Sequence, residues 1–378
     1  MIAIKSNHII IMISEKAFIN KFHRPKETYT QFLKNYKVNM RGQISSLSSY
    51  AKRKNISTQQ LKQLHESIND DYLVSFYNTS LKPHSLKIEQ SPMKNKAYNN
   101  NSNVQYKNII RNMHFEQLVY KTQPGLPNLR NYGSMLNDIY KNKVIDYKIL
   151  TPSALHYIEI GRIGSVYSSY YFRASILNPY LVYSLNETLL KGSKIFTPTL
   201  GWGSYCYGFM ESSRVSEYVG TDVISSVCKK TQQFANKFYP SKSTSIYCVP
   251  SEDLHKLPEF QKKYVGYFDV VFFSPPYYEL EKYDGAKQSI NKYKSYESWL
   301  SKYWQETIKL CFKVLKKGGK ICYIVSNYEG NDKLVDDLNG ITLKYFKLIS
   351  DQPMYNKTVN VNNNQHRNEE RIITFTKK

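Results

Sequence analysis

Cysteine is scarce in this chain and follows no regular spacing. The 378 residues include five cysteines, and no two of them form a Cys-x-x-Cys pair. An odd number without such spacing argues against a disulfide framework and against a cysteine-based metal site. We therefore expect no bound metal and a reducing, intracellular compartment.

Long apolar runs are also missing. The only one near the start is Ile9–Ile13, which is too short for the apolar region of a signal peptide and far too short to cross a membrane. We expect no membrane partner. A chain of this length can still bury one sizeable core and a smaller second domain.

Acidic residues are few compared with basic ones. Lys and Arg number 53 against 30 Asp and Glu, a formal net charge of +23, and residues 1–150 hold 23 basic and 9 acidic residues, a difference of +14. Such an excess favours contact with a polyanion through counterion release. The 34 tyrosines suit base stacking, although an AT-rich genome explains part of both signals. We expect a nucleic-acid partner.

The most informative segment is an apolar run that ends in two prolines. Residues 268–273 predict a buried central strand, and Ser274-Pro275-Pro276-Tyr277 follows it. The prolines can continue neither a helix nor the hydrogen bonding of a β-sheet. They leave a rigid turn whose carbonyls point outward, with one hydroxyl and one aromatic ring beside them. This turn suits a planar ring with an NH2 group: the Ser274 hydroxyl and the following carbonyl accept its hydrogens, and Tyr277 stacks on its face.

Three further strand ends carry residues that suit a nucleotide. They are Gly201-Trp202-Gly203, in the turn that ends the strand in the run 194–204, Asp222 at the end of strand 218–222, and Ser251-Glu252 after strand 245–248. Glycines let the backbone approach a ligand, and Asp222 lies 21 residues after Gly201, close to the spacing at which an acid meets ribose hydroxyls. These motifs in this order are more specific than a lone Gly-x-Gly.

On these residues the chain resembles the amino-methyltransferases that use S-adenosylmethionine and modify the exocyclic nitrogen of cytosine or adenine in DNA. Their target-base motif, Asp/Asn/Ser-Pro-Pro-Tyr/Phe, is matched by Ser274–Tyr277, and their cofactor motif, Asp-Pro-Phe-x-Gly-x-Gly-Thr, by Thr197–Ser204. The Gly-Trp-Gly form and the continuation to Tyr283 resemble viral and bacteriophage members. The resemblance covers about residues 170–376 and nothing in 1–150.

The resemblance implies a fold, a cofactor and a set of site residues. The fold is a three-layer, Rossmann-like class I methyltransferase with a mostly parallel sheet, beside a mainly helical basic N-terminal region. The cofactor is S-adenosylmethionine, and the compartment is cytoplasmic, nuclear or a viral factory. The cofactor-binding residues are Thr197, Pro198, Gly201, Gly203, Asp222, Ser251 and Glu252. The catalytic residues are Ser274, Pro275, Pro276 and Tyr277. Thr197 replaces the acid that often opens the cofactor motif, which removes a charged contact near the methionine amino group.

The chemistry of such enzymes needs no covalent intermediate. Hydrogen bonds to both amino hydrogens favour a pyramidal nitrogen that attacks an activated methyl group in line, so positioning supplies most of the rate. Methylation at C5 of cytosine would need a nucleophilic Cys, which follows a Pro in that family, and here no Cys follows a Pro. Cys248, Cys311 and Cys322 lie in apolar runs and are predicted to be packing residues.

The target base is less sharply defined. In the resembled family, Ser at the first motif position is commoner in N4-cytosine enzymes, and Asp or Asn in N6-adenine enzymes. Both bases present a ring nitrogen that a Ser hydroxyl can meet as a donor. Cytosine N4 is slightly preferred, and adenine N6 stays open.

The polar segment 279–293 follows the target-base motif. Its position predicts a mobile loop that closes over a flipped base. Tyr278, Glu281 and Tyr283 are the candidate substrate-binding residues.

Elements after this loop are expected to complete the domain. Residues 299–315 predict an amphipathic helix that Gly318-Gly319 caps, with Trp299 in the core. Residues 341–348 and 371–376 alternate like an antiparallel pair at the sheet edge.

Four regions are expected along the chain. They are a mainly helical basic region at 1–83, a polar Asn-rich linker at 84–106, a helical lead-in at 107–165 and the methyltransferase domain at 166–378.

A helical hairpin is expected inside the first region. Residues 43–64 predict two amphipathic helices broken at Asn55–Thr58, where Ser57 or Thr58 could cap the second. Helix-turn-helix domains contain such a hairpin, and so do other basic helical proteins.

Other functions fit parts of the pattern. An RNA adenosine N6-methyltransferase shares the turn chemistry, and a protein glutamine methyltransferase, which favours Asn at position 274, fits the positive charge poorly. A non-catalytic nucleic-acid-binding, methyltransferase-like subunit would account for Thr197. Sequence recognition is expected from residues 1–150, from the loop 356–367 or from a partner subunit, and a homodimer is also open.

Overall fold

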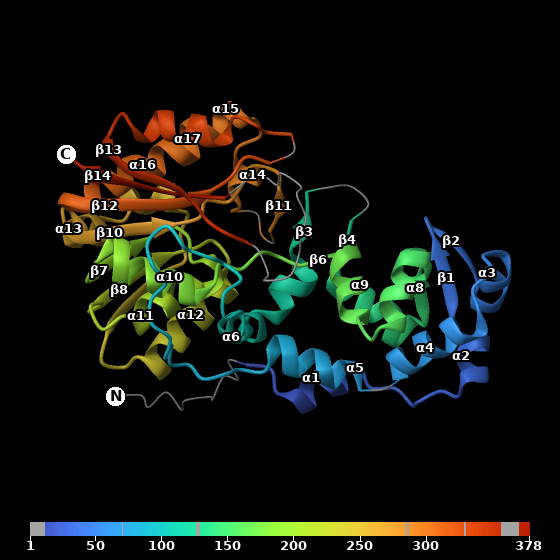
Figure 1. Cartoon of the computed structure of the whole chain (residues 1–378). Coiled ribbons are helices and arrows are strands. Elements are labelled where there is room, and N and C mark those ends of the chain that lie inside the picture. Colours follow the sequence, from blue (N-terminus) through green and yellow to red (C-terminus); the bar gives the residue numbers. More distant parts are fainter. Residues whose placement is uncertain are drawn as a thin grey trace, which may run out of the picture. The chain divides into compact units, whose positions relative to one another are not determined.

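Two compact units make up the computed structural model of this chain (Figure 1). The structure describes residues 12–69, 71–125, 129–283, 285, 287–328, 330–356 and 370–378. Among these, the sheet unit consists of residues 83–114 and 176–378, and the helical unit of residues 12–82 and 115–175. None of the described helices is both long enough and apolar enough to cross a membrane.

A seven-stranded sheet forms the centre of the described part of the sheet unit. Its strands are β7 (Lys194–Thr197), β8 (Glu217–Thr221), β9 (Ser243–Tyr247), β10 (Phe268–Phe273), β12 (Leu315–Val325), β13 (Phe346–Pro353) and β14 (Arg371–Lys377). The spatial order is β13-β14-β12-β10-β7-β8-β9. Neighbours pair in parallel, except that β14 runs antiparallel to both β12 and β13. The predicted mostly parallel sheet is confirmed.

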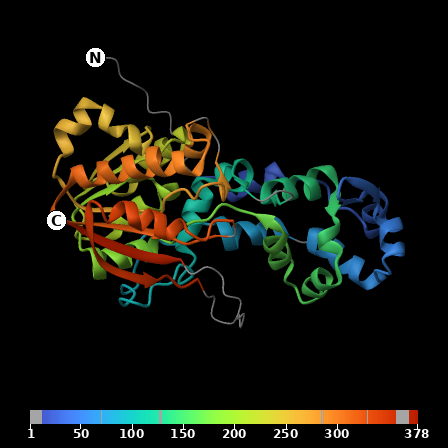
Figure 2. The ribbon, with the colours of Figure 1, turned by 90° about the horizontal axis from the view of Figure 1, so that it is seen from above.

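Helices cover both faces of this sheet (Figures 1 and 2). One face carries α10 (Pro179–Leu185), α11 (Ser204–Glu211) and α12 (Ser225–Phe238), and the other carries α13 (Pro258–Tyr264), α16 (Gln305–Val314) and α17 (Leu334–Thr342). Shorter elements are α6 (Tyr106–Met113), η5 (Asn186–Leu190), η6 (Gly201–Gly203), η7 (Ser251–Lys256), β11 (Glu281–Lys282), α14 (Ser289–Lys292), α15 (Tyr296–Trp299) and η8 (Leu300–Trp304). Because β10 is covered on both faces, Val270–Phe273 are buried as predicted. The three-layer, Rossmann-like α/β fold is confirmed.

The strand order places two loops next to each other. From β7 the chain adds β8 and then β9 on one side, and it returns to form β10 on the other side of β7. Such a switch point opens a crevice at the carboxyl ends of the two central strands, where α/β sheets bind ligands. The glycine turn follows β7, and Ser274 follows β10.

The prediction that Gly318-Gly319 cap a helix is wrong. Helix α16 ends at Val314, and β12 begins at the next residue, so both glycines lie inside the strand. Gly318 has a φ of +73°, and the pairing of β12 with β10 shifts register there. The glycines therefore accommodate a β-bulge.

The antiparallel edge pair is confirmed with a later start. Strand β13 begins at Phe346, because Leu334–Thr342 forms α17. Most of the loop 356–367, which we expected to contact DNA, lies outside the described residues.

Residues 84–106, expected as a linker, pack with the sheet unit. The Met93 amide donates to the Ser184 hydroxyl at 3.0 Å, and the fully buried Tyr98 shares a hydrogen bond of 2.8 Å with Thr188. Both partners lie on the helical segment just before β7. This polar stretch is thus fixed by hydrogen bonds rather than by apolar side chains alone.

The helical unit consists mostly of short helices. They are α1 (Glu15–Lys21), α2 (Tyr29–Asn35), α3 (Leu47–Arg53), α4 (Thr58–Asn69), α5 (Tyr72–Phe76), η1 (Tyr77–Leu81), η2 (Gln117–Lys121), α7 (Tyr132–Asn137), η3 (Asp138–Asn142), η4 (Tyr147–Leu150), α8 (Pro152–Glu159) and α9 (Ile163–Tyr170). Short strands are β1 (Lys37–Met40), β2 (Gln43–Ser46), β3 (Gln123–Pro124), β4 (Arg130–Asn131), β5 (Val144–Asp146) and β6 (Tyr171–Phe172). Strand β1 pairs antiparallel with β2 and parallel with β5, a small sheet that the sequence did not predict.

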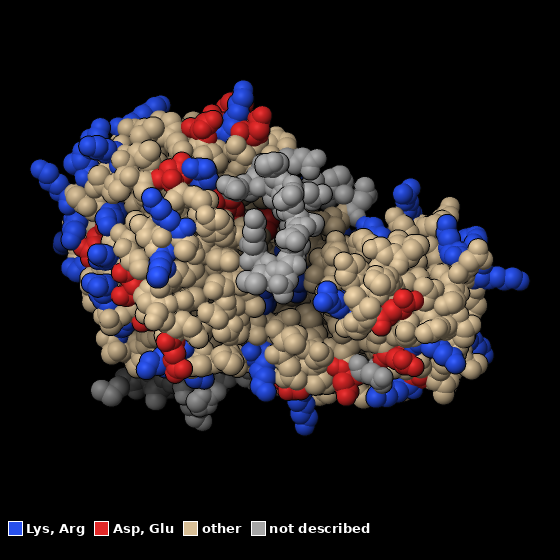
Figure 3. Space-filling view, in the orientation of Figure 1, with Lys and Arg blue, Asp and Glu red and all other residues tan. Residues whose placement is uncertain are grey.

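The predicted helical hairpin is confirmed in part as α3 and α4: Gln43–Ser46, expected in the first helix, forms strand β2, and α4 continues to Asn69. The Ser57 hydroxyl accepts from the Gln60 amide at 3.1 Å, and the Gln60 side chain accepts from the Ser57 amide at the same distance. This reciprocal cap fixes the start of α4. Lys and Arg side chains lie on the surface of the helical unit around β2 and α3 (Figure 3).

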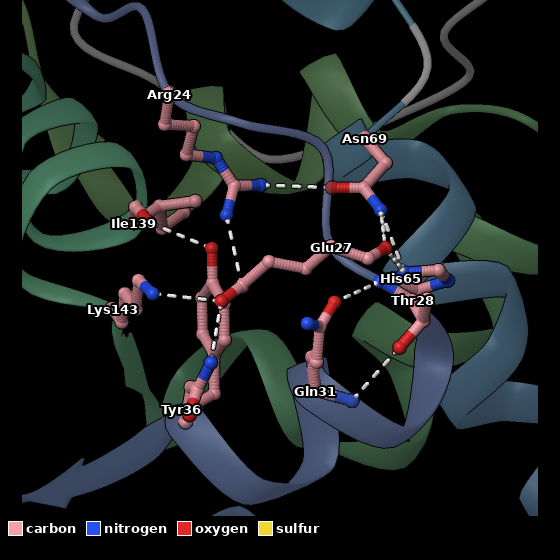
Figure 4. A network of polar contacts seen from close by, with 10 residues as sticks. Arg24, Glu27, Thr28, Gln31, Tyr36, His65, Asn69, Ile139 and Lys143 are labelled. Atoms are coloured by element: carbon pink, nitrogen blue, oxygen red, sulfur yellow. Dashed lines mark hydrogen bonds and ion pairs between the residues drawn. The ribbon is translucent and has the colours of Figure 1, made fainter.

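A buried polar network fixes the other end of α4 (Figure 4). The Glu27 carboxylate accepts from Lys143 at 2.7 Å and from Arg24 at 3.3 Å. Its backbone carbonyl meets the side chains of His65 at 2.8 Å and Asn69 at 2.6 Å. Burial acts against the charge, but the hydrogen bond and charge of Lys143 hold the Glu27 pKa below its usual range.

Candidate active site

The target-base turn is hydrogen-bonded to the glycine turn. The Ser274 amide donates to the Tyr205 hydroxyl at 3.1 Å, and the Thr199 hydroxyl donates to the Ser274 carbonyl at 3.2 Å. Thr199 precedes the glycines and Tyr205 follows them in the first turn of α11. Both backbone groups of Ser274 are therefore fixed by the loop of the neighbouring strand.

The glycine turn needs its glycines for both conformation and space. Gly201, Trp202 and Gly203 all have positive φ values, of 51°, 61° and 82°. A Cβ on Gly201 would lie 2.2 Å from the Tyr205 ring, and one on Gly203 would lie 2.8 Å from the Thr231 hydroxyl. The backbone thus lies directly on the ring that holds Ser274.

Asp222 supports the same turn from β8. Its carboxylate accepts the amides of Leu200 at 3.2 Å, Val223 at 2.8 Å and Ile224 at 3.1 Å. Burial raises its pKa, although the three amides oppose that shift. A carboxylate offers about four acceptor positions, so one is left for a ligand hydroxyl.

Gly201, Asp222 and Ser274 therefore lie in one connected site. The amide of Leu200, the residue before Gly201, donates to Asp222. Tyr205 packs its ring against Gly201 and accepts from the Ser274 amide.

Thr197 and Pro198 are buried beneath this site. The Thr197 hydroxyl shares a hydrogen bond of 2.6 Å with Tyr218, so its side chain faces the core of the sheet. The threonine that replaces the acid is therefore itself hydrogen-bonded, with no unpaired polar atom in its side chain.

Ser251 and Glu252 are buried and have hydrogen-bond partners. The Ser251 hydroxyl pairs with Thr307 at 2.9 Å. One oxygen of Glu252 accepts from Lys292 at 3.0 Å and Tyr293 at 3.1 Å, both at the end of the loop 279–293. Glu252, one of the predicted cofactor-binding residues, is thus linked to the loop.

Two contacts hold the Tyr277 side chain, one at its hydroxyl and one at its ring. Its hydroxyl accepts from the Ser326 amide at 3.0 Å, just past β12. Its ring lies parallel to Tyr328, with centroids 6.2 Å apart and an interplanar angle of 18°. Burial raises its pKa, so the phenol stays neutral.

Residues 268–378 match the model of the DNA methylase family N6_N4_Mtase. The resemblance to the N4-cytosine and N6-adenine amino-methyltransferases is confirmed for this segment. We call residues 268–378 the methylase segment. It contains β10, the target-base turn and the three later strands of the seven-stranded sheet, β12, β13 and β14.

Solved structures offer only distant likenesses. The N-methyltransferase NodS from Bradyrhizobium japonicum WM9, bound to S-adenosyl-L-homocysteine, is 11% identical, with 52% of this chain and 83% of that chain covered and a TM-score of 0.34. TrmN from Thermus thermophilus is 14% identical, with coverages of 53% and 49% and a TM-score of 0.37. An rRNA methylase from Streptococcus thermophilus is 16% identical, with coverages of 54% and 99% and a TM-score of 0.34. At such scores these likenesses say nothing about function, and no curated protein matches the chain.

The loop of the methylase segment brings Tyr283 to the glycine turn. The Tyr283 ring meets Trp202 edge-on, with centroids 5.7 Å apart, and its hydroxyl donates to Glu281 at 2.5 Å. Tyr278 packs instead on Tyr296 and Trp299. Of the three predicted substrate residues, Tyr283 and Glu281 therefore lie beside the glycine turn, and Tyr278 lies on the aromatic cluster.

Two packing predictions have mixed outcomes. Trp299 is fully buried, as are Cys311 and Cys322, which confirms their packing role. Cys248 is exposed, because it follows β9 at the edge of the sheet.

The sequence did not reveal several residues at this site. Tyr205 and Thr199 lie inside the quoted motif, but nothing in the spacing says that their hydroxyls reach Ser274. Tyr328 comes shortly after β12 in the sequence, and only the folded structure shows that its ring contacts Tyr277. The Tyr303 hydroxyl is buried with no hydrogen-bond partner among the described residues.

The link through Tyr205 can be tested by removing one atom. Tyr205→Phe leaves the Ser274 amide without its buried acceptor, which costs about 1–3 kcal/mol. We expect kcat for methyl transfer to fall about 10-fold while the cofactor dissociation constant changes less than about 3-fold. Tyr207→Phe, on the same helix with its hydroxyl on the Leu86 carbonyl, is the matched control. Equal effects from both variants would contradict a specific link.

Lys107 on α6 makes stability depend on pH. It is 5% exposed, and burial together with the nearby Arg111 lowers its pKa to about 7. The unfolded chain therefore binds one more proton between about pH 7 and its ordinary pKa near 10.5, and the free energy of unfolding rises with pH over that range.

Lys107→Met should remove this dependence. We expect the variant to unfold at a higher temperature than the parent at pH 7, with a gain on the order of 2 kcal/mol that shrinks toward pH 10. Thermal unfolding at several pH values measures this, and the exposed Lys317→Met is the control. Parallel curves for parent and Lys107→Met would contradict the buried neutral amine.

Proposed function

We propose that this protein transfers a methyl group from S-adenosylmethionine to the exocyclic amino group of a DNA base, with N4 of cytosine as the first-choice target. The observation that carries the proposal is the pair of hydrogen bonds from Thr199 and Tyr205 to Ser274. These two bonds hold the proposed cofactor-binding turn next to the proposed base-binding turn. The match of the methylase segment supports the same chemistry.

The residues around the glycine turn fit such a cofactor. The positive φ values of residues 201–203 make a tight turn at the carboxyl end of β7, where α/β sheets bind nucleotides, and Tyr205 and Thr231 support the glycines from below. The free acceptor position on Asp222 suits a ribose hydroxyl, and the unpartnered Tyr303 hydroxyl offers a buried donor among the described residues. The cofactor would supply an electrophilic methyl group at this crevice.

The target-base turn orients the amine. The Ser274 hydroxyl accepts one amino hydrogen, and since Thr199 already occupies the Ser274 carbonyl, the Pro275 carbonyl is the acceptor for the other. Both bonds favour a pyramidal nitrogen with an available lone pair. Tyr277, fixed by Ser326 and Tyr328, offers a rigid ring face on which the base stacks.

The loop 279–293 closes the site in this proposal. Tyr283 on Trp202 covers the glycine turn, and Lys292 and Tyr293 hold Glu252. A base must leave the duplex to reach the turn. A closed loop would then exclude water from the flipped base.

The proposal is tested by analysing nucleosides after reaction. The full chain is incubated with duplex DNA and methyl-labelled S-adenosylmethionine, and the digested nucleosides are identified by mass spectrometry. Label on N4-methylcytosine is the expected result, and label on N6-methyladenine would correct the base but keep the reaction. Label only with an RNA substrate would favour the RNA enzyme. No label, and no thermal stabilisation by millimolar S-adenosylhomocysteine, would favour the non-catalytic subunit.

A further inference from the structure

One stretch of the helical unit contains basic residues and no acid. Between Glu27 and Glu66 the sequence has no Asp or Glu. It has seven Lys and Arg residues, which are Lys34, Lys37, Arg41, Lys52, Arg53, Lys54 and Lys62. This stretch spans α2, β1, β2, α3 and most of α4. We call these seven side chains the basic face.

The fold turns the basic face outward. All seven side chains are exposed, and none of them forms an ion pair with a carboxylate among the described residues. The apolar sides of the same helices are buried, with Tyr50 and Ala51 on α3 and Leu61 and Leu64 on α4. The charges are therefore separated from the core, and the one acid on α4, the exposed Glu66, lies one turn beyond Lys62. Blue side chains over β2 and α3 illustrate this surface (Figure 3).

The acid that begins this stretch points away from solvent. The Glu27 side chain is only 8% exposed, and Arg24 and Lys143 neutralise it inside the unit (Figure 4). His65 and Asn69 hold α4 to the Glu27 carbonyl, which fixes that helix beneath its basic side. The network thus removes a negative charge from the surface and rigidifies the element that carries Lys62.

Polar side chains without charge accompany the basic face. Ser57, Thr58 and Gln59 are all exposed at the start of α4. The turn before them contains Asn55 with a φ of 52°, which reverses the chain within four residues. A 12-residue helix is about 18 Å long, so its first turns can enter a groove while the end of α3 and Arg41, between β1 and β2, contact the adjoining phosphates.

We propose that the basic face binds double-stranded DNA, with α4 in the major groove. The choice of DNA among polyanions rests on the proposed function. The geometry adds a reason, because the major groove of B-form DNA admits a helix and that of A-form RNA does not. Phosphates are contacted by the Lys and Arg side chains, and Ser57, Thr58 and Gln59 meet base edges.

Binding of the full chain to a fluorescein-labelled DNA duplex tests this proposal. The variant Lys52→Gln/Arg53→Gln/Lys54→Gln removes three charges from the C-terminal end of α3, just before the turn that leads to α4. We expect its dissociation constant at 100 mM salt to rise roughly 10- to 100-fold, and the slope of log affinity against log salt to fall by about 2 to 3, since each phosphate contact contributes about 0.9. Thermal unfolding shows whether it folds like the parent. If it does not, Lys34→Gln/Lys37→Gln/Arg41→Gln tests the same face.

A matched control separates the face from net charge. Lys317→Gln/Lys344→Gln/Lys347→Gln removes three exposed charges from the sheet unit, and it should keep the parent affinity within about 3-fold. An equal loss in both triples, no loss in either, or equal binding of the parent to duplex RNA would overturn the proposal. Binding is measured without methyl transfer, so a failure here leaves the nucleoside assay untouched, and a failure there leaves this result standing.

Discussion

Replacing Tyr277 by Ala is expected to slow methyl transfer at least roughly 100-fold. The loss of one aromatic stacking partner costs about 1–3 kcal/mol per base, and the upper value corresponds to about two powers of ten. The variant also removes the link to Ser326, which holds the turn against β12. Because Tyr277 does not touch the glycine turn in the described contacts, affinity for the cofactor should change only a few-fold. Single-turnover rates and calorimetric titration measure the two quantities.

Two further variants make the Tyr277 result specific. Tyr277→Phe keeps the ring and loses only the hydroxyl, so it should retain most of the activity. Tyr345→Ala removes a tyrosine that packs on Phe312, outside the candidate site, and controls for the loss of bulk. Full activity in Tyr277→Ala would exclude the stacking role.

Gly201→Ala is expected to slow methyl transfer by a similar factor, for a different reason. The new Cβ would lie 2.2 Å from the Tyr205 ring, so the ring must move and take its hydroxyl away from Ser274. The backbone φ of +51° adds strain of about 1–2 kcal/mol. We expect both cofactor affinity and turnover to fall, together by roughly 100-fold or more.

Gly266→Ala separates strain from crowding. Gly266 has a φ of +61°, and a Cβ there would meet no atom within 4 Å. This control should lose a similar amount of stability from strain and keep its activity. If both variants lost activity equally, the contact between Gly201 and Tyr205 would not be what matters.

The sequence predicts the strands and their ends because those are local features. Strands β7, β8, β9 and β10 are short runs rich in apolar, aromatic or β-branched residues, and prolines soon after β7 and β10 mark where those two strands end. Their order as a switch-point sheet follows from the resemblance. The sequence and the resemblance together therefore predict that the two turns lie at one crevice.

Side-chain contacts between distant segments could not be predicted in this way. The bonds of Thr199 and Tyr205 to Ser274 cross about 70 residues of sequence, and no periodicity encodes them. The residues 84–106 looked like a linker because few of them are apolar, yet Ile88, Met93 and Tyr98 are buried, and hydrogen bonds such as that of the Met93 amide add to their packing. Gly318 resembled a helix cap, since a bulge and a cap both need a positive φ.

The reversed strand β14 has a consequence for how this protein can diversify. Arg371 pairs with both Val325 and Pro353, so the chain leaves the sheet after β13 and re-enters it at β14 beside the end of β12. Pro353 and Arg371 therefore lie at the edge of the sheet where β12 ends, and substitutions at these two positions leave the pairing of the parallel strands unchanged. Natural variation or a laboratory graft at this position could therefore change selectivity while the transfer machinery is inherited intact.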